Sequence, residues 1–159
     1  MGARAEALAK EFEAKAAEVT AVIEKLGDPD WKKVTDAEKW SVGVVAHHVA
    51  GAHEVILGLV KAVAAGQKST TFTMDMIHAL NAKHAQDFAS CTKADTLALH
   101  RKGVATAAAG VRALSDAELD QSGAVLASVP AMSTQQVVQG ILTNHMNDHL
   151  ASIRATTGV

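Results

Sequence analysis

Apolar residues recur at steps of three and four along most of the 159-residue chain, the pattern typical of amphipathic helices. The first such stretch predicts a helix over residues 3–26. Its apolar face consists of Leu8, Phe12, Val19, Ile23 and Leu26. Gly27 is expected to end this helix, and the GDPD sequence predicts a turn. A connection that contains Trp31 and Trp40 then leads to the next apolar stretch.

Hydroxyl side chains stand where the remaining helices are expected to begin, because they can accept hydrogen bonds from free backbone amides. The predicted N-caps are Ser41, Thr73, Thr92 and Ser133. They predict helices over 42–65, 74–90, 93–114 and 134–156. Ser115 and Glu118 have capping-box spacing, which predicts a short helical turn at SDAELD.

The segments between these helices are short, and none shows a strand pattern longer than a few residues. QKSTTFT is expected to be a loop, and QSGAVLASVPAMS a loop with room for a little extended structure. Aromatic residues make up 3% of the chain, so the core must be built from aliphatic side chains and Met. The sequence therefore predicts one all-α domain over residues 1–159, a four-helix bundle with additional short helices.

Charge and cysteine content limit the partners and the cellular compartment that we expect for the chain. The net charge is −2, and basic residues do not cluster, so nucleic acid is not expected as a partner. The N-terminus lacks the apolar stretch of a signal peptide, and the single Cys91 excludes an intrachain disulfide, so we expect a cytoplasmic protein. SVGVVAHHVAGAHEVILGLV is apolar but contains three histidines and Glu54, which favours a core helix over a membrane span.

Two histidines lie one turn apart in the last predicted helix. His145 and His149 are about 40° apart around the helix and share a face with Leu142, so both are expected to point inward. This spacing allows two imidazoles to bind one metal ion, as in the zincin helix. Met146 stands where a zincin has its general-base Glu, which disfavours metalloprotease chemistry. Taken alone, the pair fits two hydrogen-bonded core or groove histidines equally well.

A third histidine changes this balance. The apolar stripe of the helix over 42–65 is centred on His48, whereas His47 lies about 100° away and His53 lies off the centre. The stripe consists of Val44, Val45, Ala52, Val55, Leu59 and Val63. Three imidazoles that face a core with few polar partners favour a Zn²⁺ or Ni²⁺ site with open coordination positions.

KWSVGVVAHHVAGA, together with the later HMNDHLASIRA, resembles the DinB-like superfamily of small helical metal-binding proteins. In that family a Trp-Ser/Thr pair opens the second helix and the first ligand histidine follows eight residues after the Trp, which here gives His48. The HxxxH pair of the family's last helix matches His145 and His149. MDMIHALNAKHAQ and LSDAELD also look similar, so the resemblance spans Trp40 to Ala155.

The resemblance implies a four-helix bundle that holds a metal through three histidines at one end, often as a homodimer. Some members look like thiol-dependent S-transferases or isomerases that use bacillithiol, mycothiol or glutathione. The apolar breadth of the helix over 42–65 points to a homodimer as well, because Val49, Leu57 and Val60 extend beyond the stripe of His48.

Other polar residues are candidates for the surroundings of such a site. Asn81 and His84 share a face of the helix over 74–90 and could contact a substrate, a thiol cofactor or a bound water; the alternative is a solvated or interhelical pair. Asp148 could hold a neighbouring imidazole, although its helix angle points to solvent. His78 and His100 are expected at the surface or in a groove.

Two classes of function stay open. In the first, the chain is a metal-dependent enzyme acting on a small molecule, either a transferase that uses a low-molecular-weight thiol or a hydrolase. In the second, it is a non-catalytic metal-binding or stress-response protein with a structural metal. The chain shows neither a Ser-His-Asp nor a Cys-His nucleophile pattern, so no catalytic side chain is assigned. A di-iron bundle is disfavoured because Glu-x-x-His does not occur.

Overall fold

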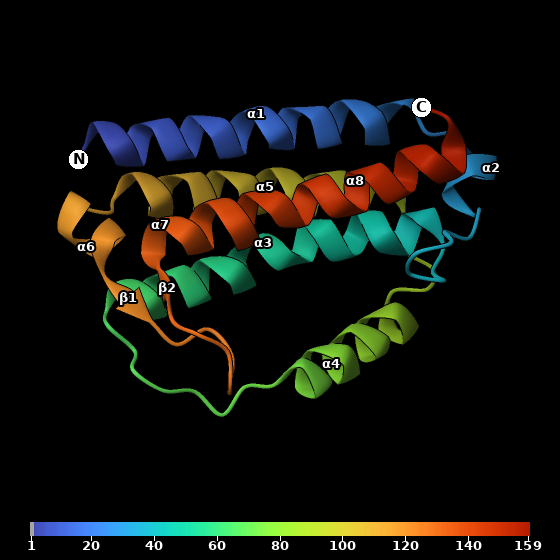
Figure 1. The fold of residues 1–159 in the computed structure, drawn as a ribbon. Coiled ribbons are helices and arrows are strands. Elements are labelled where there is room, and N and C mark those ends of the chain that lie inside the picture. Colours follow the sequence, from blue (N-terminus) through green and yellow to red (C-terminus); the bar gives the residue numbers. More distant parts are fainter. Residues whose placement is uncertain (1) are drawn as a thin grey trace.

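The computed structural model describes residues 2–159 and consists mainly of helices (Figure 1). The long helices of the bundle are α1 (Ala3–Lys25), α3 (Val42–Ala64), α5 (Lys93–Arg112) and α8 (Asn144–Thr157). α5 packs along both α3 and α1, and α8 covers the side between α3 and α1. The predicted all-α helical bundle is therefore confirmed.

Shorter elements join these helices. They are α2 (Asp28–Trp31), α4 (Met74–Asp87), α6 (Asp116–Asp120), α7 (Thr134–Val137) and the wide π turn η1 (Val138–Thr143). Strands β1 (Ser122–Gly123) and β2 (Met132–Ser133) pair antiparallel, with Ser122 opposite Ser133. This pair is the extended structure expected within the loop before the last helix.

The predicted N-caps are all used. Each caps its helix by accepting a hydrogen bond from the backbone amide three residues later; the caps are Ser41, Thr73, Thr92, Ser115 and Ser133. α4 ends at Asp87, earlier than the predicted 90, because Phe88 leaves helical geometry. The indole N–H of Trp31 donates to the Cys91 carbonyl at 3.0 Å and holds the chain in a turn there.

The last predicted helix is found as one helical run from Thr134 to Thr157, but its middle is a π-helix. The chain forms α7, then η1, in which each turn holds one residue more than an α-helix, and then α8. Val138, Leu142 and Met146 are all fully buried across this change. Wide turns of this kind occur often beside functional sites, and His145 is the second residue of α8.

Packing explains the apolar character of α3. Among residues 2–159, α3 is the one helix with the length and composition of a membrane span. In the fold, 56% of its most apolar 18-residue window is buried within the bundle. A core helix needs such a composition, because its neighbours cover more than one of its faces.

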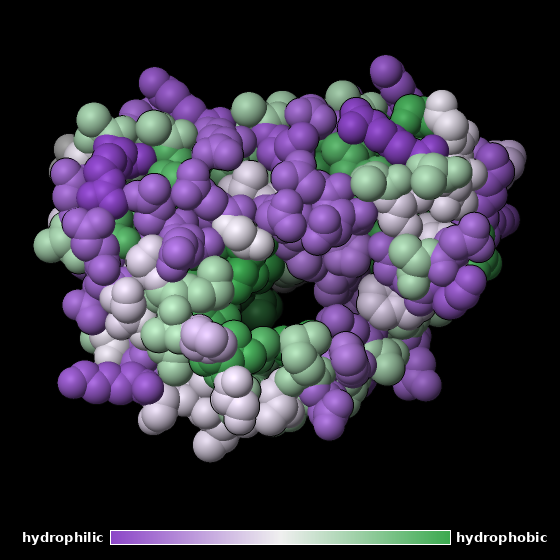
Figure 2. Space-filling model, viewed as in Figure 1, coloured by the Kyte–Doolittle hydropathy of each residue, from purple (hydrophilic) through white to green (hydrophobic). Residues whose placement is uncertain are grey.

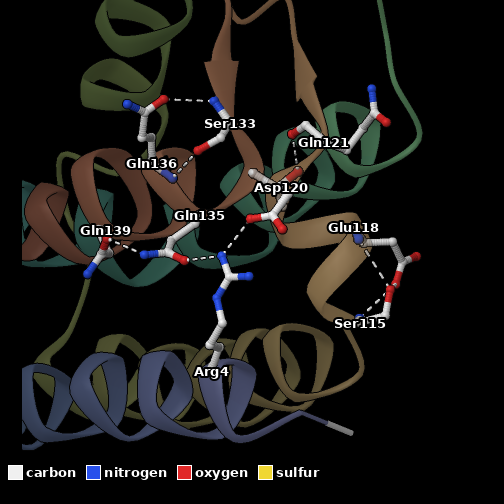
Figure 3. A network of polar contacts seen from close by, with 10 residues as sticks. Arg4, Ser115, Glu118, Asp120, Gln121, Ser133, Gln135, Gln136 and Gln139 are labelled. Carbon is white, nitrogen blue, oxygen red and sulfur yellow. Dashed lines mark hydrogen bonds and ion pairs between the residues drawn. The ribbon is translucent and has the colours of Figure 1, made fainter.

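Polar contacts fasten the bundle at the end that holds the N-terminus (Figure 3). Arg4 donates to Asp120 and to Gln135, both at 2.7 Å, and so joins α1 to α6 and α7. Close by, the backbone amide of Thr134 donates to the Gln121 carbonyl at 2.8 Å. These contacts fix the start of the segment that leads to His145.

α4 stands apart from the other helices (Figure 1). All of its residues are exposed or half-buried, including the apolar Met74, Met76 and Leu80. Figure 2 shows a hollow in the molecule beside this helix, with apolar residues gathered on one side of it. α4 therefore lies beside this hollow, and its His84 contacts His47 and His48 of α3.

Candidate metal centre

Three imidazoles from α3 and α8 meet in one cluster. His48 lies on α3, and His145 and His149 lie one turn apart on α8, which packs against α3. One ring nitrogen of each lies within 4.8 Å of the other two. Nε2 of His145 is 2.9 Å from Nε2 of His48, and the ring of His149 stands edge-on to both. The structure thus brings together the three histidines singled out in the sequence.

The cluster favours neutral rings. Burial, together with repulsion from the neighbouring imidazoles, lowers the pKa of His48 to about 3. The pKa of His145 is lowered to about 3 by the same two causes. Both rings therefore keep a lone pair at neutral pH, which is the form that binds a metal ion. Three imidazole nitrogens are a donor set that suits Zn²⁺ or Ni²⁺, so the residues present fit such an ion.

A carboxylate that the sequence reasoning missed holds His149. Nδ1 of His149 donates to Oε1 of Glu38 at 2.8 Å, and the Ser152 hydroxyl donates to Oε2 at 2.6 Å. Burial raises the pKa of Glu38, but hydrogen bonds from Ser152, Thr35 and His149 outweigh it and bring the pKa below its ordinary value. The ionised carboxylate keeps the proton on Nδ1, so Nε2 of His149 is the nitrogen left for the cluster.

A tight loop between α2 and α3 aims Glu38 at the cluster. The amide of Thr35 donates to the Trp40 carbonyl at 2.8 Å, and the amide of Lys39 donates to the Thr35 carbonyl at 3.1 Å. Lys39 itself adopts a left-handed conformation with φ 61°. The loop has no helical periodicity and lies far from α8 in sequence, so the one available signal was its position next to Trp40. The indole of Trp40 packs edge-on against His48, with ring centroids 5.4 Å apart.

His47 and His84 lie beside the cluster, and this corrects the expected orientation of His47. His47 is 7% exposed, because α4 and the turn after it cover that face of α3. Its Nδ1 is 2.8 Å from Nε2 of His84, and its ring stacks on Phe88 with centroids 4.0 Å apart. His84 also stands edge-on to His48, with centroids 5.6 Å apart. Burial lowers the pKa of both His47 and His84.

The two expected pocket residues of α4 therefore have different surroundings. His84 reaches the cluster, whereas the half-buried Asn81 forms no side-chain hydrogen bond to any residue of 2–159. Asp148 is exposed and accepts a hydrogen bond from Asn144 rather than from an imidazole. The role considered for Asp148 is filled by Glu38.

Two further histidines lie deep in the bundle. His53 and His100 are each 1% exposed, and Nε2 of His53 is 3.0 Å from Nδ1 of His100. The expectation that His100 lies at the surface or in a groove was wrong, because α5 packs against α1 and α3 together. Sequence periodicity placed His53 off the centre of one stripe, but α3 is covered on several sides.

The cluster is accessible from outside the bundle. The His149 side chain is 18% exposed, and His48 and His145 are half-buried. Three protein ligands leave a divalent ion with at least one coordination position for water or another small ligand. The rings of Trp40 and His84 pack edge-on against His48 and add aromatic surface beside the cluster. The arrangement can hold a Lewis acid at a site that a small molecule can reach.

Comparison with known proteins identifies the family of the chain. Residues 12–140 match the family model of the mycothiol maleylpyruvate isomerase N-terminal domain, which is a DinB-like superfamily member. The matched segment includes Glu38, His48 and His84, whereas His145 and His149 lie beyond its end. A search of curated proteins found no match. The resemblance seen in the sequence is confirmed, and the chain belongs to the mycothiol maleylpyruvate isomerase N-terminal domain family.

Proposed function

We propose that the protein is a metal-dependent enzyme that binds Zn²⁺ or Ni²⁺ through Nε2 of His48, His145 and His149. The reaction proposed is the transfer of a low-molecular-weight thiol, or an isomerisation that depends on one. The observation that carries the proposal is the convergence of three imidazole nitrogens within 4.8 Å. The carboxylate of Glu38, which holds the outer nitrogen of one imidazole, supports it.

A bound divalent ion supplies a Lewis acid that favours the thiolate form of a thiol near neutral pH. The uncharged rings of His48 and His145 leave the charge of the ion largely uncompensated, which favours an anionic ligand. Glu38 reaches the site only through the ring of His149, so it orients that ring without occupying a coordination position. Trp40 and His84 offer flat surfaces against which the thiol or its acceptor can lie.

The family description supports a thiol as cosubstrate. It couples mycothiol, a low-molecular-weight thiol, to the isomerisation of maleylpyruvate in the protein from which the family takes its name. For this chain we propose the broader class, a small thiol and a small electrophilic acceptor. We also propose a cytoplasmic location, in keeping with the single cysteine and the buried apolar helix α3.

A non-catalytic role is the second candidate, and one observation favours it. The cluster with Glu38 and Ser152 ties the α2–α3 loop to both α3 and α8, so a metal ion there would join three segments. In that case metal removal should lower the thermal unfolding temperature, and thiols should not perturb the site. In the enzyme, the metal should respond directly to thiols.

A titration of the Co²⁺-substituted protein with small thiols separates these roles. Thiolate ligation should add a sulfur-to-cobalt charge-transfer band in the near ultraviolet, with an affinity that rises with pH because binding releases a proton. The His145→Ala variant should lack the band, and the His78→Ala variant, altered at an exposed residue of α4, should keep it. A cobalt spectrum that millimolar thiol does not change would contradict the thiol-transfer proposal and favour a structural metal.

We further propose that two copies of the chain associate. Several large apolar side chains stay exposed on α3 and α4; they are Val55, Met74, Met76 and Leu80, at 75%, 47%, 45% and 57%. A second copy that covers them would remove this surface from water. Light scattering should give twice the chain mass of 16.5 kDa, and Leu80→Lys should shift the particle toward the monomer. A monomeric wild-type protein at tens of micromolar would contradict the proposal.

A further inference from the structure

The apolar stripe that contains His48 is left partly open in the folded chain. Its members Ala52, Val55 and Leu59 lie within about 40° of this histidine around α3. Ala52 and Leu59 are half-buried and Val55 is 75% exposed, whereas the opposite side of the helix packs in the core. A Cβ at Gly58, at the edge of the stripe, would meet no atom within 4 Å. Open space therefore borders α3 from the metal cluster toward the C-terminal end of the helix.

α4 lies beside this space and is held mainly at its two ends. Near its C-terminus, Nε2 of His84 is 2.8 Å from Nδ1 of His47. Just before its N-terminus, the Phe72 carbonyl accepts a hydrogen bond from the Ala127 amide at 2.8 Å, and the segment 124–131 around that amide has no charged residue. Between these ends, no side chain of α4 forms a hydrogen bond to α3 within residues 2–159. The middle of α4 thus stands apart from α3 (Figure 1), at the hollow seen in Figure 2.

The faces of α3 and α4 that carry the histidines are poor in charge. On α4, Ile77 and Asn81 lie about 20° and 60° from His84, and all three are half-buried in a helix that is otherwise mostly exposed. The side chain of Asn81 forms no hydrogen bond within residues 2–159, so its amide is free to bind a ligand. On α3, the charged Glu54 and Lys61 lie about 120° or more from the centre of the stripe. The two faces therefore offer apolar contact and one free amide to a ligand that leaves the cluster.

We propose that this space is a substrate channel, and that the electrophilic acceptor is a molecule with an elongated alkyl or aryl body. The proposal rests on the proposed function, because the reactive carbon of the acceptor must lie beside the metal at His48. Its body then extends along Val55 and Leu59, where it removes apolar surface from water. From His48 to Leu59 the stripe is about 16 Å long, at 1.5 Å per residue. Such a lining, mostly apolar with a single amide at Asn81, is typical of small-molecule sites.

A second copy of the chain is the competing occupant of this surface. Val55 belongs to the exposed apolar residues that the proposed dimer would cover. A ligand in the channel leaves Met74 and Met76 for that contact, because they lie about 80° from His84 on either side of α4. The channel and the dimer are therefore separable by variants that face the space directly, which are Val55→Asp and Ile77→Asp.

A series of thiols of increasing length tests the channel in the Co²⁺ protein, since the sulfur fixes one end of each probe at the metal. Affinity should rise about fourfold or more from mercaptoethanol to mercaptobutanol, and again to mercaptohexanol, because each step buries two further methylenes. Val55→Asp and Ile77→Asp should still bind mercaptoethanol, but each step should then gain less than about twofold. His78→Asp, which places the same charge on the outer side of α4, should behave as the wild type. Affinity independent of chain length in the wild type would overturn the proposal. Variants that dissociate a dimer and keep the wild-type dependence on length would overturn it too, and would assign the surface to a second copy.

Methyl NMR of the metal-free protein with millimolar hexanol tests the channel without any metal. The methyl signals of Val55, Leu59 and Ile77 should shift together, and those of Val34, 62% exposed in the loop between α2 and α3, should not. Signals that hexanol leaves unchanged would overturn the channel even if thiols bind the metal. Shifts at these three residues in a protein whose metal binds no thiol would support the channel and contradict the proposed function, so the two failures can be told apart.

Discussion

Two groups of histidines each include one residue of α3, His48 or His53, and these two residues lie a little more than one turn apart. The groups differ in the partners of their ring nitrogens. The group around His53 runs to a backbone carbonyl, where every N–H has an acceptor. The group around His48 turns ring nitrogens toward one another, and Nε2 of His145 meets Nε2 of His48 at 2.9 Å. Both groups avoid charge, because burial lowers the pKa of His48 and His53 alike to about 3.

This difference supports the proposed metal site at His48 over one at His53. Burial and neutrality are common to both groups, so neither property identifies a metal site. What separates the two groups is the partner of their ring nitrogens. In the group of His53, the Ala16 carbonyl accepts the hydrogen bond from Nε2 of His100. In the group of His48, three ring nitrogens converge, and a cation is the natural partner of converging lone pairs. The ring of His149 adds a second contrast, because Glu38 lies outside the cluster and turns its free nitrogen inward.

The largest effect expected from this comparison is the loss of metal in His48→Ala. The variant removes one of three converging nitrogens and should lower metal affinity by at least about 100-fold, or about 3 kcal/mol. His47→Ala is the matched control, since His47 is the next residue on α3 but contacts His84 instead of joining the three. Metal stoichiometry after dialysis, measured on protein without a histidine tag, reports both. Loss of metal in His47→Ala with retention in His48→Ala would reverse the assignment.

The next largest effect is a loss of folding stability in acid, which we expect in the metal-free protein. The unfolded chain binds protons on histidine near pH 6.5, whereas folded His48, His53 and His145 resist them down to about 3. Stability is therefore complete above pH 6.5 and falls as the pH drops toward about 3. Each such histidine steepens the fall by up to about 1.4 kcal/mol per pH unit.

Urea unfolding with a chelator present, between about pH 7 and pH 5, measures this slope. His53→Gln should reduce the number of protons taken up on unfolding by up to about one, and the slope in proportion, because it removes a titrating group while preserving hydrogen bonding. His78→Gln, at an exposed position of α4, should leave the slope as in the wild type. A slope unchanged in His53→Gln would show that the buried pair takes up protons without unfolding.

The carboxylate behind His149 gives the next effect. Glu38→Gln keeps the size of the side chain but removes the charge that holds the proton on Nδ1 of His149, so metal affinity should fall about 10-fold or more. Ser152→Ala removes a hydrogen bond to the same carboxylate and should weaken binding by a smaller factor. Competition with a chromophoric chelator measures both. If Glu38→Gln binds metal as tightly as the wild type, the orientation of His149 is fixed by packing alone.

The sequence predicted the parts of this molecule that depend on local chemistry. Side-chain caps such as Ser41 and Ser133 are local, and their hydroxyls are found on the expected amides. The convergence of His48 with the pair on α8 followed from two helical faces and a family spacing. The π turn η1 could not be predicted from the sequence, because the four-residue spacing of Val138, Leu142 and Met146 fits an α-helix as well as a wider turn.

What could not be predicted depends on tertiary packing. Glu38 lies in a loop without periodicity, and only the folded chain brings it to His149. His100 looks like a polar surface residue until α1 and α3 cover it from two sides. α3 buries several faces at once, so a single apolar stripe could not rank His47, His48 and His53 by their exposure.

The smallest effect concerns the loop that carries Glu38. Lys39 adopts φ 61°, which a side chain disfavours by about 1 kcal/mol, and its ammonium pairs with Asp36 only at an exposed surface, 3.7 Å away. Lys39→Gly should therefore raise the free energy of unfolding by about 0.5–1 kcal/mol, less what glycine adds to the freedom of the unfolded chain. Ser128→Gly, at the other non-glycine residue of positive φ within residues 2–159, should give a similar gain far from the cluster. Urea unfolding compares the two, and metal competition tells them apart. If the strain at Lys39 serves only to close the loop, both variants should bind metal as tightly as the wild type. If it presses Glu38 onto His149, Lys39→Gly alone should lose affinity.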